Sequence, residues 1–233
     1  MQTVSALYNT IIAGDNYWFE TQLIIDGVGT FGETQLFSIN TNVEMFQNTP
    51  TIGKAVAGEI EIKMLKPVNE IPSMAKLQPQ VRVCNGSQQS EWLAQGIYFI
   101  DTRETTKNED GLDVLTIHGY DAILKAEQYF VSENITGDST DTDMVDEIAD
   151  IMGVSVDART YTLMTEAYTI PLPTGYTLRE VLGYIAGMYV GCFVMSDIGE
   201  LRLVSLLEMP PETNYLIDQL GDAITFGGDR ILV

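Results

Sequence analysis

The chain has 233 residues, of which 45% are hydrophobic, and its 33 acidic and 12 basic side chains give a formal net charge of −21. The hydrophobic share supports a packed core and argues against a disordered chain, and the length allows one large domain or two ordinary ones. The negative charge argues against a nucleic-acid grip, because phosphate contacts need clustered Lys and Arg. It fits either simple solubility or an acidic wall that DNA slides past without sticking.

Membrane insertion and secretion are not expected. The apolar runs are too short to cross a membrane as a helix, and the first residues lack the basic start of a signal peptide. Cys84 and Cys192 lie far apart and show no metal-ligand spacing, so we expect free thiols in a reducing cytosol.

The first half of the chain shows the two-residue periodicity of β-strands. Residues 18–25 form an apolar-rich run that ends at a turn, and residues 37–45 alternate apolar and polar side chains. Residues 56–64 also alternate, with Ile60 and Ile62 on one face of the predicted strand. Three further strand-like runs follow: 80–84, 92–102 and 112–118. Regularly spaced short strands predict a barrel or a sandwich.

The periodicity becomes helical near Gly119. Residues 121–130 have helical spacing, and a second apolar stripe over 144–152 ends at Gly153, which suits a C-terminal cap. Residues 160–167 are either a short helix or irregular.

A third helix is predicted after Thr177, which forms a capping box with Glu180. Its buried face is formed by residues at helical spacing: Leu178, Val181, Leu182, Ile185, Ala186 and Tyr189. Gly191 is expected to end the helix in a left-handed conformation. Two strands, 192–195 and 201–204, then form a hairpin around the turn at 196–199.

These patterns predict an α+β fold with two parts. Residues 1–122 form a β-barrel-like tube domain, and residues 123–208 form a small α/β domain with the capped helix and the hairpin. Residues 209–233 read as a returning β segment, because a chain rarely ends on a bare apolar strand. We expect this segment to begin a second barrel, in a chain that is a fragment, or to pair back onto the first domain.

Two motifs resemble ligand-binding sequences, but a structural role explains each of them better. Gly27–Gly32 matches the dinucleotide fingerprint GxGxxG, but the following residues alternate as a strand where a helix is required, so a hairpin turn is the better interpretation. Four acids resemble a calcium loop but lack the central glycine and final Glu of an EF-hand: Asp138, Asp141, Asp143 and Asp146. Thr140 followed by Asp143 favours a helix N-terminus instead.

No catalytic, cofactor or metal residues are predicted. His118 is the only histidine, so a histidine-rich zinc site is excluded, and both cysteines lie in strand-like apolar runs where thiols are usually inert. Aromatic residues in the predicted strands fit either the core or contacts between subunits. The interface residues that we predict are Trp18, Ile60, Ile62, Trp92, Tyr98 and Phe99, within contact stretches at 56–64 and 92–103.

Three stretches carry a resemblance to a known family. The capped helix at Tyr176–Ala186, with the strand-turn-strand at 197–203, resembles the tail hub proteins of bacteriophages and prophages. Residues 90–103 and 115–122 are similar to the first barrel of that family where it runs into its first helix. The resemblance covers most of residues 18–206 and is carried by packing patterns, without a catalytic signature.

The resemblance implies a structural virion protein at the tail tip, made in the bacterial cytoplasm. Such hubs are trimers that carry two tube-like barrels per chain, whereas this sequence holds one barrel and at most the beginning of another. The implied partners are other copies of the chain, a distal tail or tube protein, the tape-measure protein, and a spike or fibre. DNA would pass through the ring without specific binding. The alternatives are a receptor- or carbohydrate-binding module, or the non-catalytic part of a tail-associated cell-wall hydrolase.

Overall fold

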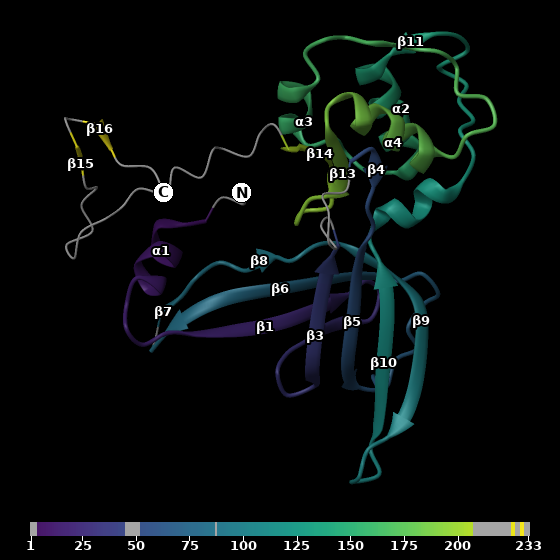
Figure 1. The fold of residues 1–233 in the computed structure, drawn as a ribbon. Coiled ribbons are helices and arrows are strands. Elements are labelled where there is room, and N and C mark those ends of the chain that lie inside the picture. The colour runs from purple at the N-terminus through teal and green to yellow at the C-terminus, as the bar shows by residue number, and fades with distance from the viewer. Residues whose placement is uncertain (1–3, 45–51, 87, 207–224, 227–228, 231–233) are drawn as a thin grey trace.

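The structure is a computed structural model that describes residues 4–44, 52–86, 88–206, 225–226 and 229–230. Figure 1 shows two parts: a curved antiparallel sheet and, beyond its upper end, a compact unit of helices and short strands. The fold is therefore mixed α+β, as the sequence predicts.

The larger part is a nine-stranded sheet whose main strand order is β2-β1-β6-β9-β10-β5-β3. A short helix, α1 (Ala6–Ile12), precedes it. The strands are β1 (Trp18–Ile25), β2 (Gly29–Phe31), β3 (Leu36–Val43), β5 (Gly58–Leu65), β6 (Lys76–Asn85), β7 (Gln88–Gln89), β8 (Leu93–Ala94), β9 (Tyr98–Lys107) and β10 (Asp113–Tyr120). The predicted hairpin at Gly27–Gly32 is confirmed, since β2 folds back onto β1 as a strand rather than opening a helix.

The sheet folds over itself at a narrow corner. β6 and β9 pair only at Lys76 with Phe99 and Leu77 with Tyr98, and β1 and β6 run across the direction of β3, β5 and β10 (Figure 1). Such an orthogonal arrangement encloses a core between the two layers. Its buried members are Leu23, Ile25, Phe31, Ile60, Ile62, Met64, Ile71, Ala75, Leu77, Tyr98, Ile100, Leu115 and Ile117.

The barrel expected from the sequence does not close. The strand order ends at β2 on one side and β3 on the other, and these two strands are not paired with each other. β2 is short and covers only the last three residues of β1, so the hydrogen-bonded ladder stops there. The described part of the sheet is thus open, with an unpaired edge at each end.

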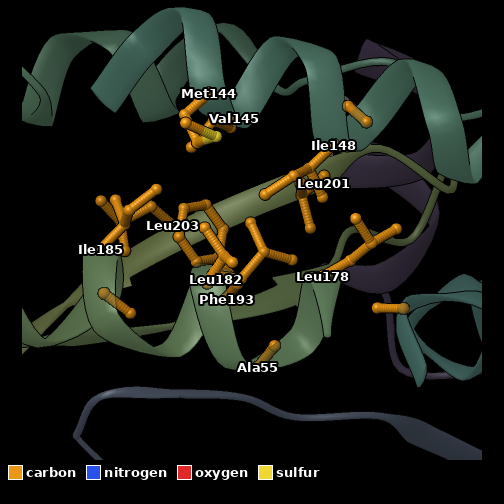
Figure 2. Close-up of a cluster of buried hydrophobic side chains, with 14 of the residues drawn as sticks. Ala55, Met144, Val145, Ile148, Leu178, Leu182, Ile185, Phe193, Leu201 and Leu203 are labelled. Atoms are coloured by element: carbon orange, nitrogen blue, oxygen red, sulfur yellow. The ribbon is translucent and has the colours of Figure 1, made fainter. Parts of the chain in front are cut away.

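The second part surrounds a small sheet of order β14-β13-β4. Its elements are β4 (Lys54–Ala55), η1 (Ala122–Glu127), β11 (Ser139–Thr140), α2 (Asp141–Met152), α3 (Ala158–Leu163), β12 (Thr169–Ile170), α4 (Leu178–Met188), β13 (Gly191–Met195) and β14 (Leu201–Ser205). Figure 2 shows side chains of α2 and α4 meeting around Phe193, Leu201 and Leu203 of the hairpin. This second core is separate from that of the large sheet.

The capped helix and the hairpin follow the prediction closely. The Thr177 backbone N–H donates to Glu180 over 2.8 Å, and the Glu180 N–H donates to the Thr177 hydroxyl over 3.2 Å. All six residues predicted for the buried face of α4 are buried. The helix ends earlier than expected, because Val190 takes the positive φ of 51° and Gly191 already begins β13.

The other predicted helices differ in detail. α2 has Thr140 as its N-cap and the left-handed Gly153 as its C-cap, as predicted. The helical stretch expected over 121–130 is a shorter 3₁₀ helix, η1, which Asp121 caps through the Ile123 N–H. Of the ambiguous stretch at 160–167, the first part belongs to the short helix α3 (Ala158–Leu163) and the remainder is not helical.

The two parts join where the chain passes from β4 into β5 and from β10 into η1. The Asp121 carboxylate accepts hydrogen bonds from the N–H groups of Gly58, at 2.6 Å, and Ile123, at 2.9 Å, and the Asp121 N–H donates to the Gly58 carbonyl. β4 also pairs in parallel with β13, so residues before position 122 contribute to the α/β part. Of the predicted returning segment at 209–233, the described residues are β15 (Thr225–Phe226) and β16 (Asp229–Arg230), which pair with each other; the rest lies outside the described residues.

Candidate functional site

The candidate site is the pair of open edges of the large sheet, together with the aromatic side chains beside one of them. β2 covers only Leu23–Ile25 of β1, so the outer side of Trp18–Gln22 has no described strand beside it. Trp18 and Phe19 are each 47% exposed, and the Tyr17 and Phe19 rings form an edge-to-face pair with centroids 5.7 Å apart. Backbone donors and acceptors next to exposed rings form a surface suited to another strand.

An ion pair braces this part of β1. Arg82 of β6 donates from Nε and from a terminal nitrogen to Glu20 at 2.8 and 2.6 Å, and its guanidinium lies 4.4 Å from the Trp92 ring centroid. The hydrogen bonds from Arg82 lower the pKa of Glu20. Contacts from β6 and from the segment that carries Trp92 therefore hold this part of β1 in place.

The opposite edge is β3, which pairs with β5 along its whole length and has no described strand on its other side. A β-bulge between Leu36 and Ser38 changes the predicted alternation. Leu36 and Ile39 therefore pack against the core, whereas Phe37 is 57% exposed. The residues toward the end of β3 are exposed as well.

The outer face of the sheet is polar. The register places Asn40, Glu61 and His118 in one row across β3, β5 and β10, and Thr102 of β9 continues that row. The next rows contain Glu59 and Lys63, and Lys63 pairs with Glu61 at 3.2 Å. This polar face is defined by Ser38, Asn40, Asn42, Glu59, Glu61, Lys63, Thr102, Glu104, Thr116 and His118. Its acids outnumber its bases.

The predicted interface residues fall into two groups. Ile60, Ile62 and Tyr98 are at most 5% exposed and belong to the core of the sheet, so their side chains are not available to another subunit. The alternation that singles out the isoleucines marks the inner face of β5, which the second layer of the same chain covers.

The remaining three reach the surface. Trp18 is exposed, Trp92 lies half-buried beneath Arg82, and Phe99 is half-buried with the Lys125 ammonium 4.5 Å from its ring centroid. Their role in subunit contacts stays a prediction. The sequence assigns Phe19, like the other strand aromatics, to either the core or a subunit contact, and the structure shows it exposed. Sequence reasoning missed the β3 edge, because strand order cannot be read from periodicity.

The two cysteines and the histidine are the side chains that the sequence considers for nucleophilic chemistry. Both thiols are buried, and burial raises the pKa of Cys84 and of Cys192, which keeps them protonated and unreactive. The Nδ1 of His118 lies 3.8 Å from a carboxylate oxygen of Glu61.

The acidic residues near 140 form the start of α2. Asp141 and Asp143 lie in its first turn, and the buried Asp141 carboxylate accepts a hydrogen bond from the Tyr189 hydroxyl. Within the described ranges, no group of three or more His, Cys, Asp or Glu side chains could hold a metal ion. Across those same residues, no helix has the length and apolar character needed to span a membrane.

Comparison with known proteins identifies solved structures with a similar fold. Neither the known protein families nor the curated proteins contain a match to this chain. Among solved structures, the 43 kDa tail protein of prophage MuSo2 from Shewanella oneidensis aligns with a TM-score of 0.56 at 16% identity, over 90% of this chain and 59% of that one. A tail protein from Neisseria meningitidis MC58 aligns with a TM-score of 0.49 at 12% identity, over 79% of this chain and 51% of that one.

The chain thus spans less than two thirds of the length of either protein. The resemblance to phage tail proteins is confirmed in three dimensions, and it extends across both the sheet and the α/β part. This chain has the fold of a prophage tail protein.

Proposed function

We propose that the chain is a structural component of a phage or phage-like tail, without enzymatic activity. The observation that carries this proposal is the shared fold over 90% of the chain with a prophage tail protein. The open sheet edges support it, since strand edges left unpaired in a free chain invite pairing with another one.

We further propose that copies of the chain form the hub ring at the tail tip, most simply as a trimer. Its neighbours would be the distal tail or tube protein, the tape-measure protein, and a spike or fibre. The polar face fits the wall of the central passage, because its exposed Glu59 and Glu104 repel the phosphate backbone. DNA would then move through the ring without being held.

Immunogold electron microscopy tests the location. Particles from the phage or prophage that encodes the chain are labelled with antibody against it, and antibody against the major capsid protein serves as the control. Gold at the end of the tail supports the proposal. Gold on the capsid, or none on particles whose proteins include the chain, would refute a tail-tip position.

One observation favours a second candidate, a carbohydrate-binding module. Tyr184 is 62% exposed and forms an edge-to-face pair with Tyr176, with ring centroids 5.5 Å apart. Tyr184 borders a hollow of about 470 Å³ that Glu180 and Arg179 also line. Aromatic rings beside charged hydrogen-bonding groups suit a sugar, so binding on a glycan array that Tyr184→Ala abolishes would favour this function over the hub.

A further inference from the structure

The strand edges of the large sheet differ in how they are protected. Beyond Ile100, whose N–H donates to the Ala75 carbonyl, β9 has only β10 as a described strand partner, and it carries four charged residues: Asp101, Arg103, Glu104 and Lys107. Charged side chains are the usual protection against unwanted strand addition. β3 has no charged residue along its eight positions, although its outer side has no described strand beside it. Its edge therefore lacks the protection that the same sheet provides elsewhere.

The edge of β1 also has features that suit contact with another strand. Because side chains alternate along a strand, Phe19 and Tyr17 lie on the face that carries the buried Leu23 and Ile25. Tyr17 is 42% and Phe19 47% exposed, so the apolar inner face continues past the point where the chain's own second layer covers it. On the opposite face stands the exposed Trp18.

We propose that the β3 edge (Leu36–Val43) of one copy pairs with the β1 edge (Trp18–Gln22) of the next copy, which no described strand covers. The two edges lie at opposite ends of one sheet, so the contact joins different surfaces of identical chains and can repeat around a ring. The partner is a second copy of the chain, because each chain has both an uncharged strand edge and an edge whose exposed aromatic side chains another strand would bury. This inference rests on the proposed structural role and names the surfaces that fulfil it.

Matched lysine substitutions test the pairing. Thr41→Lys places a charge in the exposed half of β3, and Thr105→Lys makes the same change on the charged edge of β9. Phe19→Lys places a charge at the β1 edge. Sedimentation of the full chain over a concentration series should show self-association, which Thr41→Lys and Phe19→Lys each weaken by on the order of tenfold or more. Thr105→Lys should associate like the unmodified chain, and circular dichroism checks that all variants fold.

Mixing the two disrupted variants gives the sharper result. Thr41→Lys keeps an intact β1 edge and Phe19→Lys keeps an intact β3 edge, so an equimolar mixture should form 1:1 dimers at concentrations at which neither variant associates alone. Hydrogen exchange should slow at 18–22 and 36–43 on association, with 101–107 unchanged. A chain that stays monomeric at high concentration, a mixture that does not dimerise, or protection elsewhere would overturn the proposal. The tail location tested by immunogold labelling would stand in each of those cases, since another tail protein could cover the edges.

Discussion

Gly191 offers a direct test of how tightly the α/β part is packed. It begins β13 and pairs with Ser205 of β14. A Cβ atom at position 191 would lie 2.4 Å from the Val204 carbonyl oxygen and 3.0 Å from its carbon. These are backbone atoms of a paired strand, and they cannot rotate away as the end of a side chain could.

Gly191→Ala should therefore be strongly destabilising. Overpacking a well-packed site usually costs about 1–3 kcal/mol, and a collision with backbone belongs at the upper end, about 3 kcal/mol. For a chain of this size, each kcal/mol lowers the melting temperature by about 2–4 °C. Gly137→Ala is the matched control, because no atom lies within 4 Å of its added Cβ and its φ is not left-handed. We expect the control to change stability by less than about 0.5 kcal/mol.

The assay must report on the correct part of the molecule. Both tryptophans, Trp18 and Trp92, belong to the sheet part, so their fluorescence does not follow the hairpin directly. Urea unfolding followed by far-ultraviolet circular dichroism, with hydrogen exchange read out over 178–205, covers the helices and the hairpin. If Gly191→Ala were as stable as Gly137→Ala, the register of β13 against β14 would be wrong.

Three further predictions concern Asp121, the α4 cap and the two cysteines. Burial raises the pKa of Asp121 to about 6 from 3.8, so its contribution to the free energy of unfolding is present below pH 4 and is lost as the pH rises through 6. Relative to Asp121→Asn, the unmodified chain should therefore lose up to about 3 kcal/mol of stability between pH 4 and 7, and parallel pH curves for the two would contradict the assigned burial. Thr177→Ala removes the α4 cap and should cost about 1 kcal/mol in urea unfolding, while Thr177→Ser should stay close to the unmodified chain. Cys84 and Cys192 should react with a thiol reagent only after unfolding, and fast reaction of the native chain would show that they are accessible.

Local signals made much of the α/β part predictable. The capping box at Thr177, the apolar stripe of α4 and the turn before Leu201 each depend on residues close together in sequence, and the structure contains all three. The same holds for α2, whose caps at Thr140 and Gly153 are set within one turn of the helix.

Long-range pairing was not predictable in the same way. β4 has only two residues and joins β13 from a distant part of the chain, so no periodicity marks it as a strand. The bulge at Phe37 reverses the side that this ring faces, although the residue types still suggest simple alternation. Gly191 reads as a helix stop in sequence, but its role is the close approach of Val204.

The candidate site was predictable only in part. Alternation identifies the inner face of β5, but whether Ile60 and Ile62 meet a second layer or a second subunit depends on the folding of the whole sheet. Trp18 was singled out because aromatic residues are common in interfaces, and it is exposed. That it lies beside an unpaired edge follows from the strand order alone.

A cryo-electron microscopy reconstruction of the tail that contains this chain tests the central claim most directly. It should show a ring of copies at the tail tip in which the β3 strand of each copy runs beside residues 18–22 of its neighbour, with the polar face toward the passage. A reconstruction in which the chain lies outside the tail would contradict the proposed role. One in which the chain lies in the tail with both edges facing solvent would contradict the proposed contact.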